Sequence, residues 1–174
     1  MTNKLQAITS GFFSKDILDI APNLLGHYLV VWWYKSEKIY QINEIEIYRW
    51  EEDGACHARK WITKRTQIMY WPWWYRYIYL VYWMYNMINI VCNTKWNPQA
   101  ILIRWAWPFT WPWKLTRDLW INTQYNWQKA SPDNWLWFSF NPHKSITYYT
   151  TPRVWINYAP EPRKSKERRF IVHS

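Results

Sequence analysis

The spacing of apolar positions predicts a helix near the N-terminus. In Ser14–Leu25 apolar side chains recur three and four residues apart, which is the spacing of one helix face. Ser14 or Asp16 can cap the first turn, and Gly26 can end the helix in a left-handed conformation. Pro22 lies inside the segment, where it can kink or split the helix.

The segments that follow have the composition of strands. We expect strands at Tyr28–Tyr34 and Ile39–Tyr48, joined by a polar turn at Lys35–Lys38, and further strands at Tyr75–Tyr82 and Ala100–Arg104. The chain contains no repeat, heptad pattern or linker. Its 174 residues therefore predict a single α+β domain.

Composition narrows the class of protein. Hydrophobic residues make up 49% of the chain and charged residues 20%, which is typical of a globular protein. No apolar run approaches the roughly 20 residues of a membrane span, and the N-terminus lacks the pattern of a signal peptide. Cys56 and Cys92 are too few for a disulfide framework or a four-cysteine zinc site. We expect a reduced, cytoplasmic protein without a metal or other cofactor.

The charge points to an anionic partner. The formal net charge is +10 and the isoelectric point is near 9.6. Basicity of this size is typical of nucleic-acid-binding proteins. A generally basic proteome would give the same value, so charge alone leaves both explanations open.

Tryptophan and glycine are present in unusual numbers. The chain holds 18 Trp and 3 Gly, although a chain of this length would ordinarily carry about a dozen glycines. Many of the indoles stand in turn-like sequences at 71–74, 110–115, 126–127 and 134–135. Turns with positive φ favour glycine or asparagine, and a bulky side chain is strained there.

One predicted strand carries a candidate for chemistry. Side chains alternate along a strand, so Glu44, Glu46 and Tyr48 share one face while Ile45 and Ile47 share the other. Charged strand faces are common on protein surfaces, so the pair of carboxylates is a modest signal by itself. The surrounding sequence, NEIEIYRWEEDGACHAR, adds His57 nine residues after Tyr48.

With glycine in place of tryptophan, the motifs become those of a known family. The segments EIYRWEEDGACHAR, YIYLVYWMYNMIN, AILIRWAWP, TWPWKL and RVWI then read EIYRGEEDGACHAR, YIYLVYGMYNMIN, AILIRGAGP, TGPGKL and RVGI. In this order and spacing the chain resembles the alkyladenine (3-methyladenine) DNA glycosylase family nearly from end to end. The resemblance implies a curved antiparallel sheet, flanking helices and a protruding β-hairpin that enters the DNA minor groove.

The resemblance leads to a hypothesis about the gene. Tryptophan stands at family glycines, namely Trp73, Trp83, Trp111, Trp113 and Trp155. We interpret these as UGA codons that the host reads as glycine. The alternative is that the indoles are real and form a base-stacking surface. The hypothesis predicts that the chain as written leaves many of the indoles exposed in loops, while Trp137, in a strand-like context, can be genuine.

The resemblance also implies a mechanism, hydrolysis of the bond between a damaged purine and its deoxyribose. Glu46 is the implied general base for the attacking water, and Arg104 positions that water or a phosphate. Glu44 shares the strand face and is the rival in the sequence. The family spacing favours Glu46, with Ile47 in place of the usual alanine.

A base must leave the stack to reach such a site. The resemblance implies a pocket in which Tyr48, His57 and Tyr79 hold an electron-poor base between their rings. Asn89 stands at the position that excludes guanine through a clash with its exocyclic amine. Alkylation at N3 or N7 makes a purine a better leaving group, so discrimination also comes from the chemistry of the base.

The remaining implied contacts are to DNA. Tyr82 would fill the gap left by the flipped base, Met69 and Met84 would pad the hairpin and the site, and Lys114 would reach a phosphate. The connection around Phe109 is shorter than is usual in the family, which affects affinity and substrate range. The expected partner is double-stranded DNA with damaged purines, bound by a monomer in a bacterial cytoplasm.

Two other functions stay open from the residues alone. A non-catalytic protein could use basic and aromatic residues to bind nucleic acid, and would then show a long aromatic groove without a buried carboxylate. An enzyme predicts instead that Glu46, Tyr48, His57, Tyr79 and Arg104 converge on one cleft. A formyl-transferring or deformylating enzyme is a third interpretation, for which no metal motif gives support.

Overall fold

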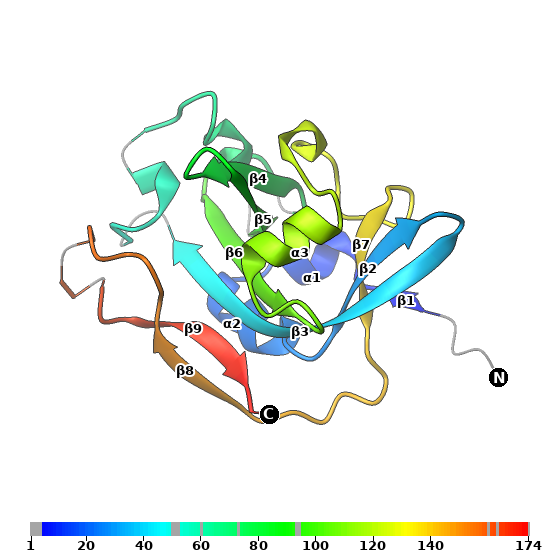
Figure 1. Cartoon of the computed structure of the whole chain (residues 1–174). Coiled ribbons are helices and arrows are strands. Elements are labelled where there is room, and N and C mark those ends of the chain that lie inside the picture. Colours follow the sequence, from blue (N-terminus) through cyan, green and yellow to red (C-terminus); the bar gives the residue numbers. More distant parts are fainter. Residues whose placement is uncertain are drawn as a thin grey trace.

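A computed structural model of the chain describes residues 5–49, 53–59, 61–72, 74–92, 95–159, 161–162 and 164–173. In that part of the chain nine strands form one sheet, and every pairing is antiparallel. The strands run in the order β1-β7-β2-β3-β6-β5-β4, and β9 with β8 branches from β3 (Figure 1). Their bounds are β1 Gln6–Ala7, β2 Tyr28–Trp33, β3 Ser36–Arg49, β4 Arg76–Val81, β5 Tyr85–Cys92, β6 Gln99–Ala106, β7 Leu136–Phe140, β8 Tyr148–Pro152 and β9 Glu167–Val172.

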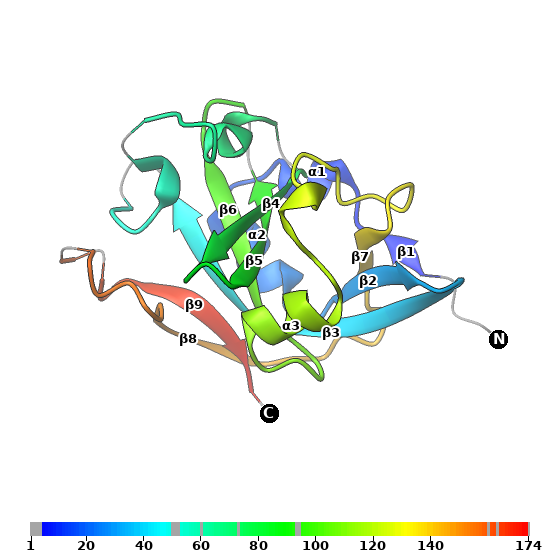
Figure 2. The same cartoon turned by 45° about the horizontal axis from the view of Figure 1, so that its top comes forward.

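Short helices cover this open sheet (Figure 2). Helix α2 packs on β3 and β6, and α3 packs on β5 and β6. The main core lies where apolar side chains of α1 and α2 meet the sheet, with Phe13, Ile20, Ile45 and Ile47 all buried. The helices and 3-10 turns are α1 Ser10–Phe13, α2 Ile17–Leu24, η1 His57–Arg59, η2 Gln67–Tyr70, α3 Pro112–Asp118 and η3 Thr123–Tyr125.

The N-terminal helix forms as predicted in most respects. Asp16 is the N-cap of α2, and its side chain accepts a hydrogen bond from the backbone N–H of Leu18 at 2.9 Å. Pro22 lies inside α2 without ending it, and Gly26 follows the helix with φ of 76°. The predicted start at Ser14 is three residues too early, because Asp16 caps the helix and α2 begins at Ile17. Residues 10–13 form a separate helix, α1, that was not predicted.

Two expectations about turns are wrong. The turn between β2 and β3 is Tyr34–Lys35 and not Lys35–Lys38, because both residues adopt positive φ and let Trp33 pair with Ser36. The turn-like sequence at 110–115 is largely helix, since α3 begins at Pro112. Proline at the first helical position has no N–H to leave unpaired and already has a helical φ, which explains this start.

A β-hairpin made of β4 and β5 stands at one edge of the sheet. Its register joins Val81 to Tyr85, so Tyr82, Trp83 and Met84 form the turn. The three side chains are 69%, 94% and 66% exposed. The fold is therefore α+β with a mostly antiparallel open sheet and few helices, and it carries a hairpin with an aromatic tip.

Indoles occupy strained and exposed positions. Nine described residues other than glycine have φ in the left-handed region, and six of them are tryptophan, although tryptophan is 18 of 174 residues. Ten of the 16 described indoles are exposed, and only Trp137, in β7, is buried. Trp73 lies outside the described residues. The six left-handed positions are Trp74, Trp83, Trp96, Trp120, Trp127 and Trp155.

Candidate active site

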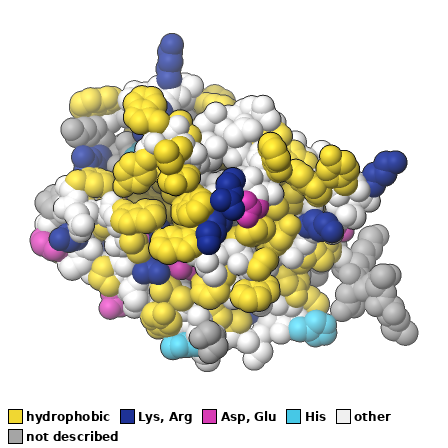
Figure 3. All heavy atoms as spheres, in the orientation of Figure 1, with side chains coloured by type: hydrophobic (Ala, Val, Ile, Leu, Met, Phe, Trp, Pro, Cys, Tyr) yellow, Lys and Arg dark blue, Asp and Glu magenta, His cyan; other side chains and the backbone are white. Residues whose placement is uncertain are grey.

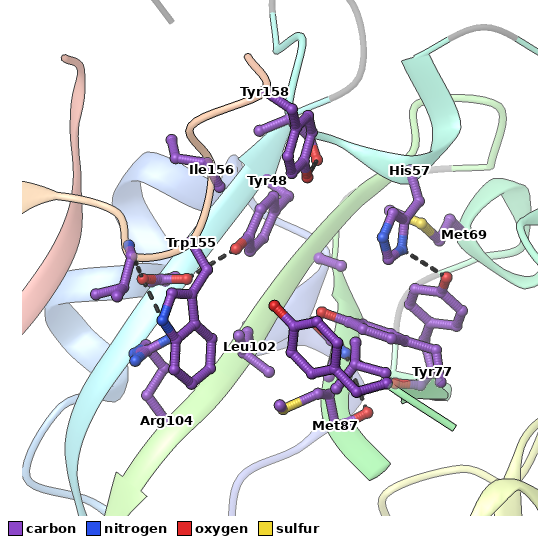
Figure 4. A pocket seen from close by; sticks show the side chains of 18 residues that line it. Tyr48, His57, Met69, Tyr77, Met87, Leu102, Arg104, Trp155, Ile156 and Tyr158 are labelled. Carbon is purple, nitrogen blue, oxygen red and sulfur yellow. Dashed lines mark hydrogen bonds and ion pairs between the residues drawn. The ribbon is translucent and has the colours of Figure 1, made fainter. Parts of the chain in front are cut away.

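A pocket opens between the β4–β5 hairpin, the face of β3 and the segment after β8. Its volume is about 250 Å³, slightly below the roughly 300–1,000 Å³ of most small-molecule sites. Seven of the 18 lining residues carry aromatic rings, and one carboxylate and one guanidinium stand on the side of β3 and β6 (Figure 4). The lining residues that the sequence singled out are Glu46, Tyr48, His57, Met69, Tyr79, Tyr82, Asn89 and Arg104.

Glu46 is a fully buried carboxylate with three donors around it. The Tyr48 hydroxyl donates to Oε2 at 2.7 Å and the Val154 backbone N–H donates to Oε1 at 2.8 Å. The Arg104 guanidinium lies 3.4 Å from Oε1. Burial raises the pKa of Glu46 above its ordinary value, while the charge of Arg104 and the two hydrogen bonds act in the opposite direction.

The rival carboxylate, Glu44, lies outside the pocket. Its Oε1 accepts from Arg104 at 2.5 Å and from Arg169 of β9 at 2.7 Å. Register shifts interrupt the pairing of β3 with β6 on both sides of Glu44, whereas Glu46 pairs regularly with Leu102. The strand therefore presents only Glu46 to the pocket and uses Glu44 to hold Arg104.

The aromatic wall has two sides. The His57 and Tyr79 rings meet edge to face with centroids 4.6 Å apart, and His57 Nδ1 shares a hydrogen bond of 2.9 Å with the Tyr77 hydroxyl. A base cannot enter between rings that are already in contact, so it would have to lie between this pair and Tyr48. Figure 4 shows Tyr48 on the side of Arg104 and Trp155, with His57 and Tyr77 across the cavity.

His57 is uncharged at neutral pH. Burial, together with the nearby charges of Arg65 and Arg59, lowers its pKa from 6.5 to about 4. The Arg65 guanidinium also lies 5.0 Å from the centroid of the Tyr79 ring. A neutral imidazole adds no positive charge to the cavity, which suits the stacking of an electron-poor base.

Asn89 is buried and its amide is immobilised. The Nδ2 group donates to the backbone oxygens of Tyr77 at 3.1 Å and of Met87 at 3.4 Å. Both partners belong to the hairpin strands, so the sheet itself holds this side chain in the wall of the pocket.

The expected DNA contacts fall at different places. Tyr82 and Met84 lie at the hairpin tip, where Tyr82 also lines the mouth of the pocket. Met69 is 2% exposed and belongs to the pocket wall rather than to the outer surface. Lys114 lies on α3, with its ammonium 5.7 Å from the Trp113 ring and outside the pocket. Hydrophobic side chains gather on this face of the molecule, over β4, β5 and α3 (Figure 3).

The sequence interpretation missed several groups at the site. Val154 supplies the backbone donor to Glu46, and Tyr77 and Tyr158 line the pocket. The motif RVWI at 153–156 was visible in the sequence. Almost every residue has a backbone N–H, however, so the identity of residue 154 could not show that its N–H would bind Glu46. Within the described residues no three His, Cys, Asp or Glu side chains gather as metal ligands would.

The pocket thus places a buried carboxylate beside a group of aromatic side chains. Residues 11–111 match the family described as methylpurine-DNA glycosylase (MPG). The chain belongs to this family, which places it among the DNA glycosylases of base excision repair, with DNA as substrate.

Named relatives agree with the family match. A protein of Legionella pneumophila (strain Corby), named "Putative 3-methyladenine DNA glycosylase", is 33% identical over 157 residues, which is 86% of each chain. A protein of the same name from Borreliella burgdorferi (strain ZS7) is 34% identical over 92% of this chain and 93% of its own. Another from Rickettsia bellii (strain RML369-C) is 33% identical over 94% of this chain and 71% of its own. No helix in the described part of the chain is long and apolar enough to cross a membrane.

Proposed function

We propose that the protein flips alkylated or deaminated purines out of duplex DNA and hydrolyses their N-glycosidic bond, leaving an abasic site. The observation that carries the proposal is the position of Glu46, a carboxylate with no exposed surface that Tyr48, Val154 and Arg104 hold at the wall of an aromatic slot. The reaction is monofunctional, since water rather than an amine of the protein is the nucleophile.

Glu46 acts as the general base. Oε1 and Oε2 accept hydrogen bonds on opposite sides, which fixes the plane of the carboxylate next to the cavity. The carboxylate takes a proton from water as that water attacks C1′, and its negative charge stabilises the oxocarbenium-like sugar of the transition state. The charge of Arg104 favours the ionised form of this carboxylate against the effect of burial, and its guanidinium has donors left to position the water or a phosphate.

The base lies between Tyr48 and the His57–Tyr79 pair, and Tyr82 fills the gap in the duplex. The exposed hairpin tip gives Tyr82 the reach for this, while its ring still borders the pocket. Unstacking costs a few kcal/mol, which an inserted side chain and the stacking of the base offset. Asn89 excludes guanine because its amide cannot move away from the exocyclic amine.

The non-catalytic alternative fits the geometry less well. It predicts an aromatic groove without a buried carboxylate, whereas Glu46 is 0% exposed and lines the pocket. Burying a carboxylate costs free energy, and a protein that only binds nucleic acid has no use for that cost. We further propose that the protein acts as a monomer in the cytoplasm.

The test is Glu46→Gln, measured as single-turnover release of a damaged purine from a duplex that carries one lesion. We expect the rate to fall about 10²-fold to 10⁴-fold, the size of a general-base contribution, while lesion binding stays within a few fold. Glu37→Gln, at an exposed position on the same strand, is the control. Full activity of the Glu46 variant contradicts the assignment.

A further inference from the structure

The outer edge of β4 is covered only in part. β4 is the last strand in the order of the sheet, and residues 126–129 run along its open side. The Arg76 N–H donates to the Gln128 backbone oxygen at 3.0 Å. The Asn126 side chain imitates a peptide group, because its Oδ1 accepts from the Ile78 N–H at 2.6 Å and its Nδ2 donates to the Ile78 oxygen at 2.8 Å. This cover ends at Ile78.

The next backbone donor on the open side is the N–H of Leu80. In an antiparallel ladder alternate residues point their N–H and C=O groups away from the neighbouring strand. Ile78 directs both groups to Asn126, so Leu80, two residues further along, directs its own groups to the same side. No described residue on that side accepts a hydrogen bond from this N–H. An unpaired donor therefore lies two residues before Tyr82.

A second cavity, of about 250 Å³, lies at this edge, and two cations line it. Both cations come from the loop before η2, and both side chains are exposed. Neither has an ion-pair partner in the part of the chain that the structure describes. Positive charges beside a free backbone N–H are the donors that bind a phosphate group. The polar residues and the strand residue that line the cavity are Lys64, Arg65, Leu80, Thr123 and Asn126.

This second cavity adjoins the candidate active site, since Tyr79 lines both. The Arg65 guanidinium lies 5.0 Å from the centroid of the Tyr79 ring, and its Nη2 lies 3.4 Å from His57 Nε2. Leu80 is two strand residues from Tyr82, a separation of about 7 Å. Two nucleotides advance by about the same 7 Å along a duplex. A strand that places its damaged base in the active site would therefore bring a nearby phosphate to the second cavity.

We propose that the cavity at the edge of β4 binds one phosphate of the damaged strand, within two nucleotides of the flipped base. Lys64 and Arg65 supply the charge, and the Leu80 N–H fixes the position of one phosphate oxygen. The inference rests on the proposed function, because it concerns how the duplex is held while its base occupies the active site. Lys64 and Leu80 do not line the pocket that holds the base, so they act on binding and not on the chemical step.

Two variants test the site through the affinity for a duplex that carries one abasic-site analogue. Lys64→Gln removes one charge and should weaken binding about 3-fold to 10-fold, and the slope of log K against log salt should decrease in magnitude by about one. Leu80→Pro removes the N–H at an edge position that tolerates proline, and should weaken binding by a similar factor. Lys38→Gln, at an exposed position in the β2–β3 hairpin, is the control and should leave both quantities nearly unchanged.

Single methylphosphonate linkages, which are uncharged, locate the phosphate. At the contacted position such a linkage should weaken binding by the unmodified protein about 3-fold to 10-fold, and should weaken binding by the Lys64 variant no further, because both changes remove one interaction. At every other position the two proteins should respond equally.

Equal responses of the two proteins at every linkage, or a non-additive response on the undamaged strand, overturn the inference. If Leu80→Pro does not fold, Lys64→Gln and the neutral linkages still decide the matter. Failure of the unmodified protein to release any damaged base would instead refute the proposed function, whereas the phosphate site is judged from binding alone.

Discussion

Replacing the exposed left-handed tryptophans by glycine should stabilise this protein. Six described indoles have positive φ, and five of those are exposed by 39–94%. A side chain in the left-handed region costs about 1–2 kcal/mol, because its Cβ crowds the following carbonyl oxygen. Exposed rings have less packing to lose on replacement than buried ones. The five positions are Trp83, Trp96, Trp120, Trp127 and Trp155.

The expected magnitude follows from two opposing terms. Relief of the backbone strain gains about 1–2 kcal/mol per position, and the greater freedom of glycine in the unfolded chain costs about 0.5–1 kcal/mol. The net gain of about 0.5–1 kcal/mol per position adds to roughly 2.5–5 kcal/mol for five separated sites. For a chain of this size the midpoint of thermal unfolding should rise by roughly 5–20 °C.

Thermal unfolding followed by circular dichroism measures the shift. Glycine at Trp32, Trp61 and Trp107 is the matched control, since these indoles are 53%, 65% and 61% exposed but have no positive φ. The control variant should be less stable than the starting chain, because there is no strain to relieve. A lower midpoint in the five-glycine variant, or equal shifts in both variants, refutes the strain argument.

Unpaired buried indoles are a second sign that the gene encodes glycine at some of these positions. The buried indole nitrogens of Trp74, Trp105 and Trp135 have no hydrogen-bond partner in the described part of the chain, which costs about 1–3 kcal/mol each. Strain at turns and unpaired buried donors are both expected where glycine has been written as tryptophan. Peptide masses of the protein from its natural host decide the matter. Tryptophan masses at 83 and 155 would refute the reassignment of UGA.

Two further predictions concern the pocket. Asn89→Ser should raise release of guanine-type bases relative to hypoxanthine several fold, because it removes a clash, and unchanged ratios would count against the gate. His57 should titrate in nuclear magnetic resonance near pH 4 and not near 6.5. Because its folded pKa lies below its unfolded pKa, the unfolded state binds more protons between these values. Stability should therefore fall as the pH drops from 6.5 to 4, by up to about 3 kcal/mol for this residue, and His57→Gln should remove that part of the loss.

Sequence patterns predicted correctly those features of the fold that depend only on neighbouring residues. The cap at Asp16 and the stop at Gly26 could be predicted, because each acts through its own neighbours in sequence. Alternation along β3 placed Glu46 and Tyr48 on one face. Strand β9 was missed, because it pairs with β3 from the far end of the chain and its first three residues are charged.

The difference between Glu44 and Glu46 could not be predicted from the residues alone. Alternation alone treats Glu44 and Glu46 alike. Their different surroundings come from a register shift against β6 and from Arg169, which arrives on β9. Neither of these leaves a local signal. The resemblance to the family pointed to Glu46, and the backbone donor of Val154 explains the choice in physical terms.

Position 155 bears both on the identity of the encoded residue and on the proposed mechanism. Its backbone has φ of 62° directly after Val154, whose N–H holds Glu46, so this turn helps to aim the donor at the carboxylate. Its indole lies 5.6 Å from the Arg104 guanidinium and stacks against Trp111, with centroids 6.2 Å apart. Figure 4 shows the ring in front of Arg104 at the pocket. The turn thus needs a left-handed residue, and a nucleotide approaching Arg104 needs that residue to be small. Glycine meets both needs, whereas tryptophan is strained in the left-handed backbone and its ring lies over Arg104. The strain at this position and the proposed chemistry therefore lead to the same residue.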